Sequence, residues 1–288
     1  MRNIVSVLDA PRPHWVGDGF PVRSLLSHHE HGAAISPFLL LDYAGPYHFE
    51  PARAPRGVGE HPHRGFETVT IVYQGELEHR DSTGAGGKIG PGDVQWMTAA
   101  SGVLHQEFHS DAFTATGGNF EAVQLWVNLP AKDKMARPGY QTLVQGEIPD
   151  VALTNGAGYV RVIAGSFNGV EGPARVHTAL DIWDVRLNPG GVAELRVPEG
   201  HTLHIAVLSG TVLANDAKVV REAQVVVFDK TGGAVTIEAN GEAKLLVLSG
   251  APIAEPVAAY GPFVMNTPTE IRQAIEDLNA GRFGAITA

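Results

Sequence analysis

The chain has 288 residues, and none of them is cysteine. This absence excludes disulfide bonds, thiolate zinc sites, iron–sulfur clusters and thiol nucleophiles. Any metal site in this protein must therefore be built from histidine and carboxylate side chains.

Basic side chains are also scarce. Lys and Arg number 21 against 31 Asp and Glu, and the formal net charge at pH 7 is −10. Because binding to phosphates needs clustered cations, this balance argues against a nucleic-acid partner and against an anionic membrane surface. No apolar run reaches the roughly 18 residues of a membrane span, and Pro and charged residues interrupt the N-terminus before a signal core can form. We expect a cytoplasmic protein.

What the chain does contain is typical of a β-rich globular protein. Hydrophobic residues make up 44% of the chain, and Gly occurs 34 times. Short strands rich in β-branched residues, such as residues 67–73 and 94–98, alternate with Gly- and Pro-rich turns. This pattern favours barrels or sandwiches, and the length fits about two domains, although one large all-β domain would also fit.

A weak internal repeat predicts two similar halves. Residues 66–75 (FETVTIVYQG) align with residues 203–210 (LHIAVLSG), each an apolar strand that ends on Gly. The alignment places His61 and His63 opposite Arg196 and Pro198, so the second copy keeps the strands and loses the imidazoles. We predict a duplicated β-barrel, with a metal-binding domain over residues 1–135 and a domain without the metal ligands over residues 136–288.

One helix is expected at about residues 268–280. Thr267 and Glu270 have the spacing of a capping box, with Pro268 at the first helical position. Apolar residues then recur at helical spacing until Gly281, and we expect the helix to pack on a barrel wall.

The histidines are crowded into the first part of the chain, where ten of the 13 precede residue 110. His61 and His63 are two residues apart, as are His105 and Glu107. Because residues two apart on a strand share a face, two such pairs meeting inside a barrel would place three imidazoles and one carboxylate around one point. Donors of this kind suit Fe(II), Mn, Ni, Co, Cu or Zn. The alternative is that these histidines are ordinary hydrogen-bonding residues of a strand, at the surface or in the core.

Residues 57–107 resemble the signature of the pirin family in the cupin superfamily. The resemblance rests on HPHRGFETVT, GPGDVQWMTA and SGVLHQE, and SPFLLLD and GPFVMN extend it over nearly the whole chain. It implies an all-β fold of two double-stranded β-helix (cupin, jelly-roll) barrels packed together, with a C-terminal helix. It also implies a monomer, with one metal in the N-terminal barrel held by His61, His63, His105 and Glu107.

The general cupin pattern takes its carboxylate ligand from a position near Glu67, whereas the pirin pattern takes it from Glu107. Glu67 shares strand parity with His61 and His63, but Gly65 can introduce a bulge that redirects it. We therefore expect Glu67 beside the ligands, with direct metal binding as the alternative. His79-Arg-Asp81 is interpreted as polar strand residues entering a loop, and His109 as a residue at the site's mouth or in solvent.

The resemblance implies a metal-dependent dioxygenase, as in some bacterial pirins, that opens the ring of a flavonol such as quercetin with O2. Glu107 would accept the proton of the substrate hydroxyl. The metal would be one divalent transition ion, with Fe(II) favoured over Mn, Ni, Co, Cu or Zn. The alternatives are a non-catalytic iron-binding co-regulator of a partner enzyme or transcription factor, and a zinc hydrolase or isomerase on the same scaffold. The partner would accordingly be a small aromatic substrate or a regulatory protein.

Overall fold

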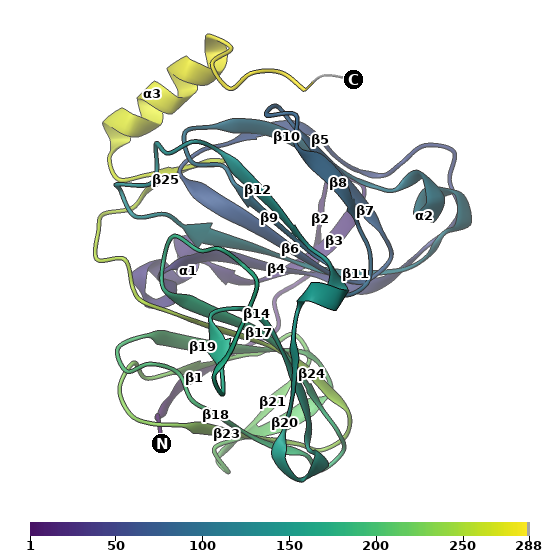
Figure 1. Ribbon diagram of the computed structural model, residues 1–288, viewed down its shortest axis with the longest axis vertical. Helices are drawn as coiled ribbons and strands as arrows, with labels where there is room; N and C mark the ends of the chain where they lie inside the picture. The colour runs from purple at the N-terminus through teal and green to yellow at the C-terminus, as the bar shows by residue number, and fades with distance from the viewer. Residues whose placement is uncertain (287–288) are drawn as a thin grey trace. The chain divides into compact units, whose positions relative to one another are not determined.

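The computed structural model describes residues 1–286, which fold into two compact units of antiparallel strands (Figure 1). We call N-terminal barrel the unit made of Pro13–Val22, Phe38–Gln145 and residues 253–286. We call C-terminal barrel the unit made of Met1–Arg12, Arg23–Pro37 and Gly146–Pro252.

The N-terminal barrel is built on two sheets. The larger sheet has the strand order β12 (Gly139–Leu143), β9 (Val94–Thr98), β6 (Phe66–Gln74), β11 (Gly118–Asn128), β4 (Phe38–Phe49), β3 (Phe20–Ser27) and β2 (His14–Val16). The smaller sheet has the order β5 (Gly57–His63), β10 (Val103–His109), β7 (Leu77–Asp81) and β8 (Gly86–Ile89). A short hairpin adds β25 (Ala258–Tyr260) and β26 (Phe263–Met265).

The C-terminal barrel repeats this plan. Its larger sheet has the order β1 (Ile4–Leu8), β22 (Val225–Phe228), β19 (Thr202–Ser209), β24 (Ala243–Gly250), β17 (Leu180–Leu187), β14 (Gly158–Ala164) and β13 (Asp150–Ala152). Its smaller sheet has the order β18 (Val192–Leu195), β23 (Val235–Ala239), β20 (Thr211–Ala214) and β21 (Lys218–Arg221), and β15 (Ser166–Phe167) pairs with β16 (Val170–Glu171).

Helical structure is confined to short elements and one longer helix. These are α1 (His28–His31), α2 (Asp111–Thr116) and α3 (Pro268–Asn279), with 3₁₀ turns η1 (Gly32–Ile35), η2 (Gln145–Glu147) and η3 (Thr154–Gly156). None of the helices within residues 1–286 combines the length and the apolar character that a membrane span needs.

The predicted duplication is confirmed by the strand order. The two aligned segments form β6 and β19, and each occupies the same place in its sheet: β6 lies between β9 and β11, and β19 lies between β22 and β24. Gly75 and Gly210 follow these strands with φ of 84° and 87°, a left-handed conformation that favours glycine. The same local signal thus ends the same strand in both barrels.

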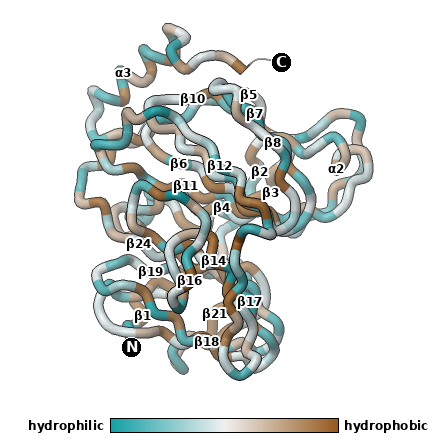
Figure 2. Tube along the Cα trace, viewed as in Figure 1, coloured by the Kyte–Doolittle hydropathy of each residue, from teal (hydrophilic) through white to brown (hydrophobic). Residues whose placement is uncertain are grey.

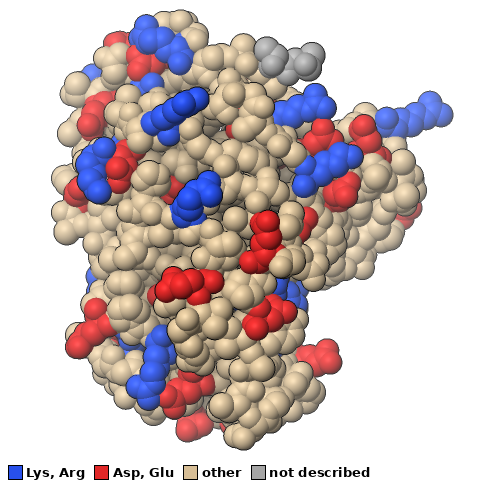
Figure 3. Space-filling model, in the orientation of Figure 1, with Lys and Arg blue, Asp and Glu red and all other residues tan. Residues whose placement is uncertain are grey.

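Each barrel encloses side chains that alternate along its strands. In the C-terminal barrel, alternate residues of both sheets, such as Leu203 and Ile205 of β19 and Ile237 of β23, form one buried apolar cluster. Figure 2 shows apolar stretches along the strands and hydrophilic residues in many of the connecting loops. On the face drawn in Figure 3, basic side chains lie interspersed with acidic ones.

The ends of the chain do not follow the predicted boundaries at residues 135 and 136. Strand β1 pairs with β22 of the C-terminal barrel, and the Arg2 guanidinium donates to carbonyl oxygens of His201 and Asp229. At the other end, residues 253–286 belong to the N-terminal barrel. Each terminus packs where its apolar residues find a partner surface, and strand patterns do not reveal which barrel supplies that surface.

Helix α3 confirms the predicted helix, and it packs on the N-terminal barrel. Thr267 and Glu270 form both hydrogen bonds of the capping box. The buried face of the helix joins Ile271 and Ala274 to Phe263, and the partly buried Leu104 of β10 packs against this cluster. The helix therefore supports the strand that supplies His105.

Candidate metal centre

Three imidazoles meet where β5 and β10 pair. In this antiparallel pair His61 lies opposite His105, and His63 lies opposite Val103. The ring centroids of His61 and His63 lie 4.2 and 4.8 Å from that of His105. One nitrogen from each of the three rings lies within 4.8 Å of the others. The structure thus brings the His61 and His63 pair together with His105 of the second predicted pair.

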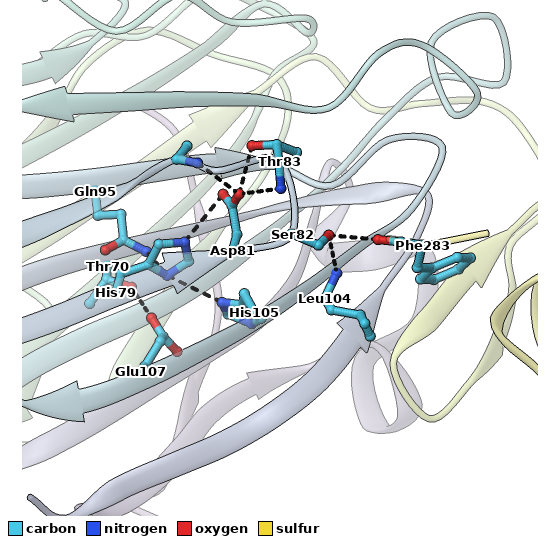
Figure 4. Close-up of polar contacts among 11 residues, drawn as sticks. Thr70, His79, Asp81, Ser82, Thr83, Gln95, Leu104, His105, Glu107 and Phe283 are labelled. Atoms are coloured by element: carbon cyan, nitrogen blue, oxygen red, sulfur yellow. Dashed lines mark hydrogen bonds and ion pairs between the residues drawn. The ribbon is translucent and has the colours of Figure 1, made fainter. Parts of the chain in front are cut away.

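Glu107 lies next to His105 and faces the same cavity as His61 and His63. One of its carboxylate oxygens lies within 4.8 Å of a His105 nitrogen. The Thr70 hydroxyl donates to Glu107 Oε1 at 3.3 Å, and the Gln124 side-chain amide donates to Oε2 at 2.9 Å (Figure 4 draws the first contact). Two neutral donors thus orient the carboxylate without cancelling its charge.

A polar row crosses the larger sheet beneath Glu107. It consists of directly paired residues on four neighbouring strands: Asp42 of β4, Gln124 of β11, Thr70 of β6 and Gln95 of β9. Because cross-strand partners share a face, all four side chains project to the same side of the sheet. No single stretch of sequence contains this row, so strand-by-strand reading missed it.

The cavity beside these residues has a volume of about 350 Å³ and is mostly apolar. Its wall consists of Val16, Phe20, Val22, Leu40, Asp42, Ala44, Val58, His61, His63, Thr70, Glu107, Ala122, Val123, Gln124, Trp126 and Pro262. Trp126 packs against Phe66 and His63 in this wall. An apolar cavity of this size with a few converging polar groups is typical of a small-molecule site.

The donor set fits a divalent metal ion. Burial, followed by neighbouring histidines, lowers the pKa of His63 and His105 well below the ordinary value, so both rings are neutral as metal ligation requires. His63 Nδ1 and His105 Nε2 are buried without a hydrogen-bond partner. The His61 Nδ1–H can donate to the Gly59 carbonyl at 2.8 Å, which leaves Nε2 with its lone pair. These imidazoles and the Glu107 carboxylate suit a divalent transition metal.

Glu67 does not take part in this group. Gly65 has φ of 89°, and the chain turns there from β5 into β6, so the parity shared with His61 and His63 is lost. Thr70 of the same strand faces Glu107, and Glu67, three residues before it, points to the opposite side of the sheet. Its carboxylate accepts a 2.6 Å hydrogen bond from Thr98. Neither group of possible ligands found within residues 1–286 includes it.

One further expectation was wrong. His109 does not lie at a mouth or in solvent; it is buried among Phe20, Phe49 and Phe120, and its Nε2 contacts the Gly19 carbonyl at 3.0 Å. His79 and Asp81 are polar strand residues that enter a loop, as expected, and the structure shows in addition that both are buried directly behind His105 (Figure 4). The signal that could have found them is their parity on β7, where they alternate with outward-facing Glu78 and Arg80.

His79 belongs to a second group of possible ligands together with His105 and Glu107. Both of its nitrogens already have polar partners. Nδ1 lies 2.8 Å from the Gln95 amide nitrogen and 3.3 Å from His105 Nδ1, and Nε2 lies 3.5 Å from Asp81 Oδ2. The group of His61, His63 and His105 is therefore the better candidate for metal binding, because its ring nitrogens have fewer competing polar partners than those of His79.

The two barrels and the histidine cluster in one of them define a bicupin with a candidate mononuclear metal centre. The family models agree in both halves: Pirin matches residues 19–127, and the Pirin C-terminal cupin domain matches residues 182–284. The chain belongs to the pirin family.

Similar proteins span the whole chain. A Pseudomonas aeruginosa protein named as a candidate quercetin 2,3-dioxygenase is 58% identical, covering 98% of this chain and 99% of its own. The crystal structure of quercetin 2,3-dioxygenase from Acinetobacter baumannii superposes with a TM-score of 0.97 at 50% identity, covering all of both chains. The bacterial pirin YhhW from Escherichia coli, solved with nickel(II), has the same fold with a TM-score of 0.67 at 18% identity, covering 86% of this chain and 99% of its own.

Proposed function

We propose that this protein is a metal-dependent dioxygenase of the quercetin 2,3-dioxygenase type, which opens a flavonol ring with O2 and releases carbon monoxide. The observation that supports this most directly is the position of His61, His63 and Glu107 in the wall of an apolar cavity, with His105 grouped beside them. The relatives from Pseudomonas aeruginosa and Acinetobacter baumannii bear the name of this activity. The proposed metal ligands are His61, His63, His105 and Glu107.

The metal, Fe(II) in our proposal, would supply a Lewis-acidic centre that favours the deprotonated form of a substrate hydroxyl. The chain's own residues bind and orient the substrate. The apolar wall, with Trp126 and Phe20, receives the flat rings and excludes water.

Glu107 would accept the proton of the substrate hydroxyl at one carboxylate oxygen. Its side chain is buried, and the contacts to Thr70 and Gln124 hold its plane. A base held in this way keeps its lone pairs directed at the cavity, which reduces the reorganisation needed when the proton moves. Glu107 is thus both a proposed ligand and the proposed catalytic residue.

The test is oxygen uptake by protein loaded anaerobically with Fe(II), with quercetin and related flavonols as substrates. We expect O2 consumption equal to flavonol loss, with carbon monoxide released, and a large drop in turnover in Glu107→Gln. Glu78→Gln is the matched control, because Glu78 lies on β7 with its side chain pairing with Arg80 on the outer face. Full metal occupancy without oxygen uptake on any flavonol would overturn the proposal and favour a non-catalytic role with a protein partner.

A further inference from the structure

A chain of polar contacts runs from the turn after β7 to the candidate ligand His105. Figure 4 shows Asp81, His79 and His105 in series, with Gln95 beside His79. Asp81 Oδ2 lies 3.5 Å from His79 Nε2, and His79 Nδ1 lies 3.3 Å from His105 Nδ1. All three side chains are at most 4% exposed, so water does not compete for these contacts.

Asp81 determines which group donates and which accepts in each contact of this chain. Its Oδ1 accepts from the Thr83 amide at 2.8 Å, the Thr83 hydroxyl at 2.6 Å and the Ala85 amide at 3.2 Å. The carboxylate is therefore held by the turn, with Oδ2 directed at His79. Because an ionised carboxylate only accepts, the proton in that contact must reside on His79 Nε2.

The position of this proton determines the next contact. A neutral His79 with its proton on Nε2 has a lone pair on Nδ1. That lone pair accepts from the Gln95 amide at 2.8 Å and, in a longer three-centre contact at 3.3 Å, from His105 Nδ1, because two lone pairs facing each other would repel. His105 then carries its proton on Nδ1, and its lone pair is on Nε2, the buried nitrogen that has no hydrogen-bond partner.

We propose that Asp81 and His79 are positioning residues that hold His105 in its Nδ1–H tautomer and so direct the Nε2 lone pair toward the metal. His61 achieves the same result with a backbone carbonyl, that of Gly59. Such outer hydrogen bonds fix the orientation of ligating imidazoles and increase their basicity. This inference rests on the metal site of the proposed function and is independent of the substrate.

Asp81→Asn is the decisive substitution because the turn dictates how the new amide lies. The Thr83 and Ala85 amides need an acceptor, so the Asn oxygen takes the place of Oδ1 and the Asn NH2 faces His79. His79 must then accept at Nε2 and carry its proton on Nδ1. His105 Nδ1 becomes an acceptor, and its proton moves to Nε2, the atom that the metal needs.

The direct measurement is the two-bond ¹H–¹⁵N spectrum of histidine-labelled, metal-free protein, which distinguishes the two tautomers. We expect Nδ1–H for His105 in the native chain and Nε2–H in Asp81→Asn. Ni(II) affinity, measured by competition with a chelating dye, should fall about 10- to 100-fold in Asp81→Asn. It should not change in Glu78→Gln, which alters a carboxylate on the outer face of the same strand.

A second pair of variants keeps the test decisive if Asp81→Asn does not fold. His79→Gln offers a carbonyl oxygen to His105 Nδ1–H, whereas His79→Leu has similar bulk and no acceptor. We expect His79→Gln to retain more Ni(II) affinity than His79→Leu. If His79 only fills space beside Tyr140, which stacks on it, His79→Gln should have no advantage over His79→Leu.

The proposal is overturned by native His105 in the Nε2–H form, or by unchanged Ni(II) affinity and tautomer in folded Asp81→Asn. Equal affinities of the two His79 variants would also refute it. A native chain that binds no Ni(II) and no Fe(II) would instead refute the metal site itself, so the two failures are distinguishable.

Discussion

The ion pair between Arg64 and Asp277 joins the strand of the candidate ligands to the C-terminal helix. Arg64 directly follows His63, and its Nη1 lies 2.7 Å from Asp277 Oδ2 on α3. The two side chains are 4% and 12% exposed. Arg64 also donates to the Ser101 carbonyl and lies over the Phe283 ring, so its guanidinium is held on several sides.

The contribution of Asp277 to stability can be calculated from its pKa. The hydrogen bond from Arg64, followed by that from Gln273, lowers the pKa of Asp277 from 3.8 to about 2. At about 1.4 kcal/mol per pH unit, this difference corresponds to about 2 kcal/mol in favour of the docked helix. Because the pKa is depressed in the folded state, the contribution is fully present above pH 4 and is lost as the pH falls toward 2.

We therefore expect Asp277→Asn to destabilise the docking of α3 by about 2 kcal/mol at pH 7, and the difference from the native chain to shrink between pH 4 and pH 2. Hydrogen exchange of the α3 amides, corrected for the intrinsic pH dependence, measures the free energy of local opening. About 2 kcal/mol corresponds to roughly 30-fold faster exchange. Glu276→Gln is the control, because this carboxylate lies exposed on the same helix.

Unchanged exchange of α3 in Asp277→Asn at pH 7 would refute this reasoning. So would a difference from the native chain that persists undiminished at the lowest pH, because a protonated Asp277 should resemble Asn.

Two predictions concern the site itself. His63→Ala should lower Ni(II) affinity by more than about 100-fold, because it removes a proposed ligand, whereas His177→Ala in the exposed part of the C-terminal barrel should leave it unchanged. Gln124→Leu should keep metal occupancy but slow flavonol turnover about tenfold, because Glu107 loses its 2.9 Å donor. Metal content is measured by elemental analysis and turnover by oxygen uptake.

Equal Ni(II) affinity of His63→Ala and His177→Ala would contradict the proposed ligand set. Full turnover in Gln124→Leu would show that the Glu107 carboxylate does not depend on this hydrogen bond for its orientation.

Local patterns were enough to predict several features. The capping box of α3 depends on residues three apart, and the Gly that ends β6 and β19 acts through its own backbone conformation. The pairing of His61 with His63 follows from strand periodicity alone, and the absence of cysteine restricts any metal to nitrogen and oxygen ligands. Each of these signals lies within one element, so no long-range contact was needed to detect it.

The polar row and the chain from Asp81 to His105 were decided only by the tertiary structure. Asp42, Gln124, Thr70 and Gln95 come from four strands, and their common face depends on the register of each pair. For Glu67, strand periodicity counted along the sequence predicted the wrong face. Gly65 turns the chain from the smaller sheet into the larger one, so the periodicity does not continue from His63 to Glu67.

Composition and strand periodicity were sufficient to identify the residues that could bind a metal and to predict a duplicated β-structure. The tertiary structure decided which of those residues meet, which carboxylate faces the cavity, and which barrel each end of the chain joins. This division arises because strand identity depends on nearby residues, whereas strand register and the docking of α3 depend on contacts between residues far apart in the chain.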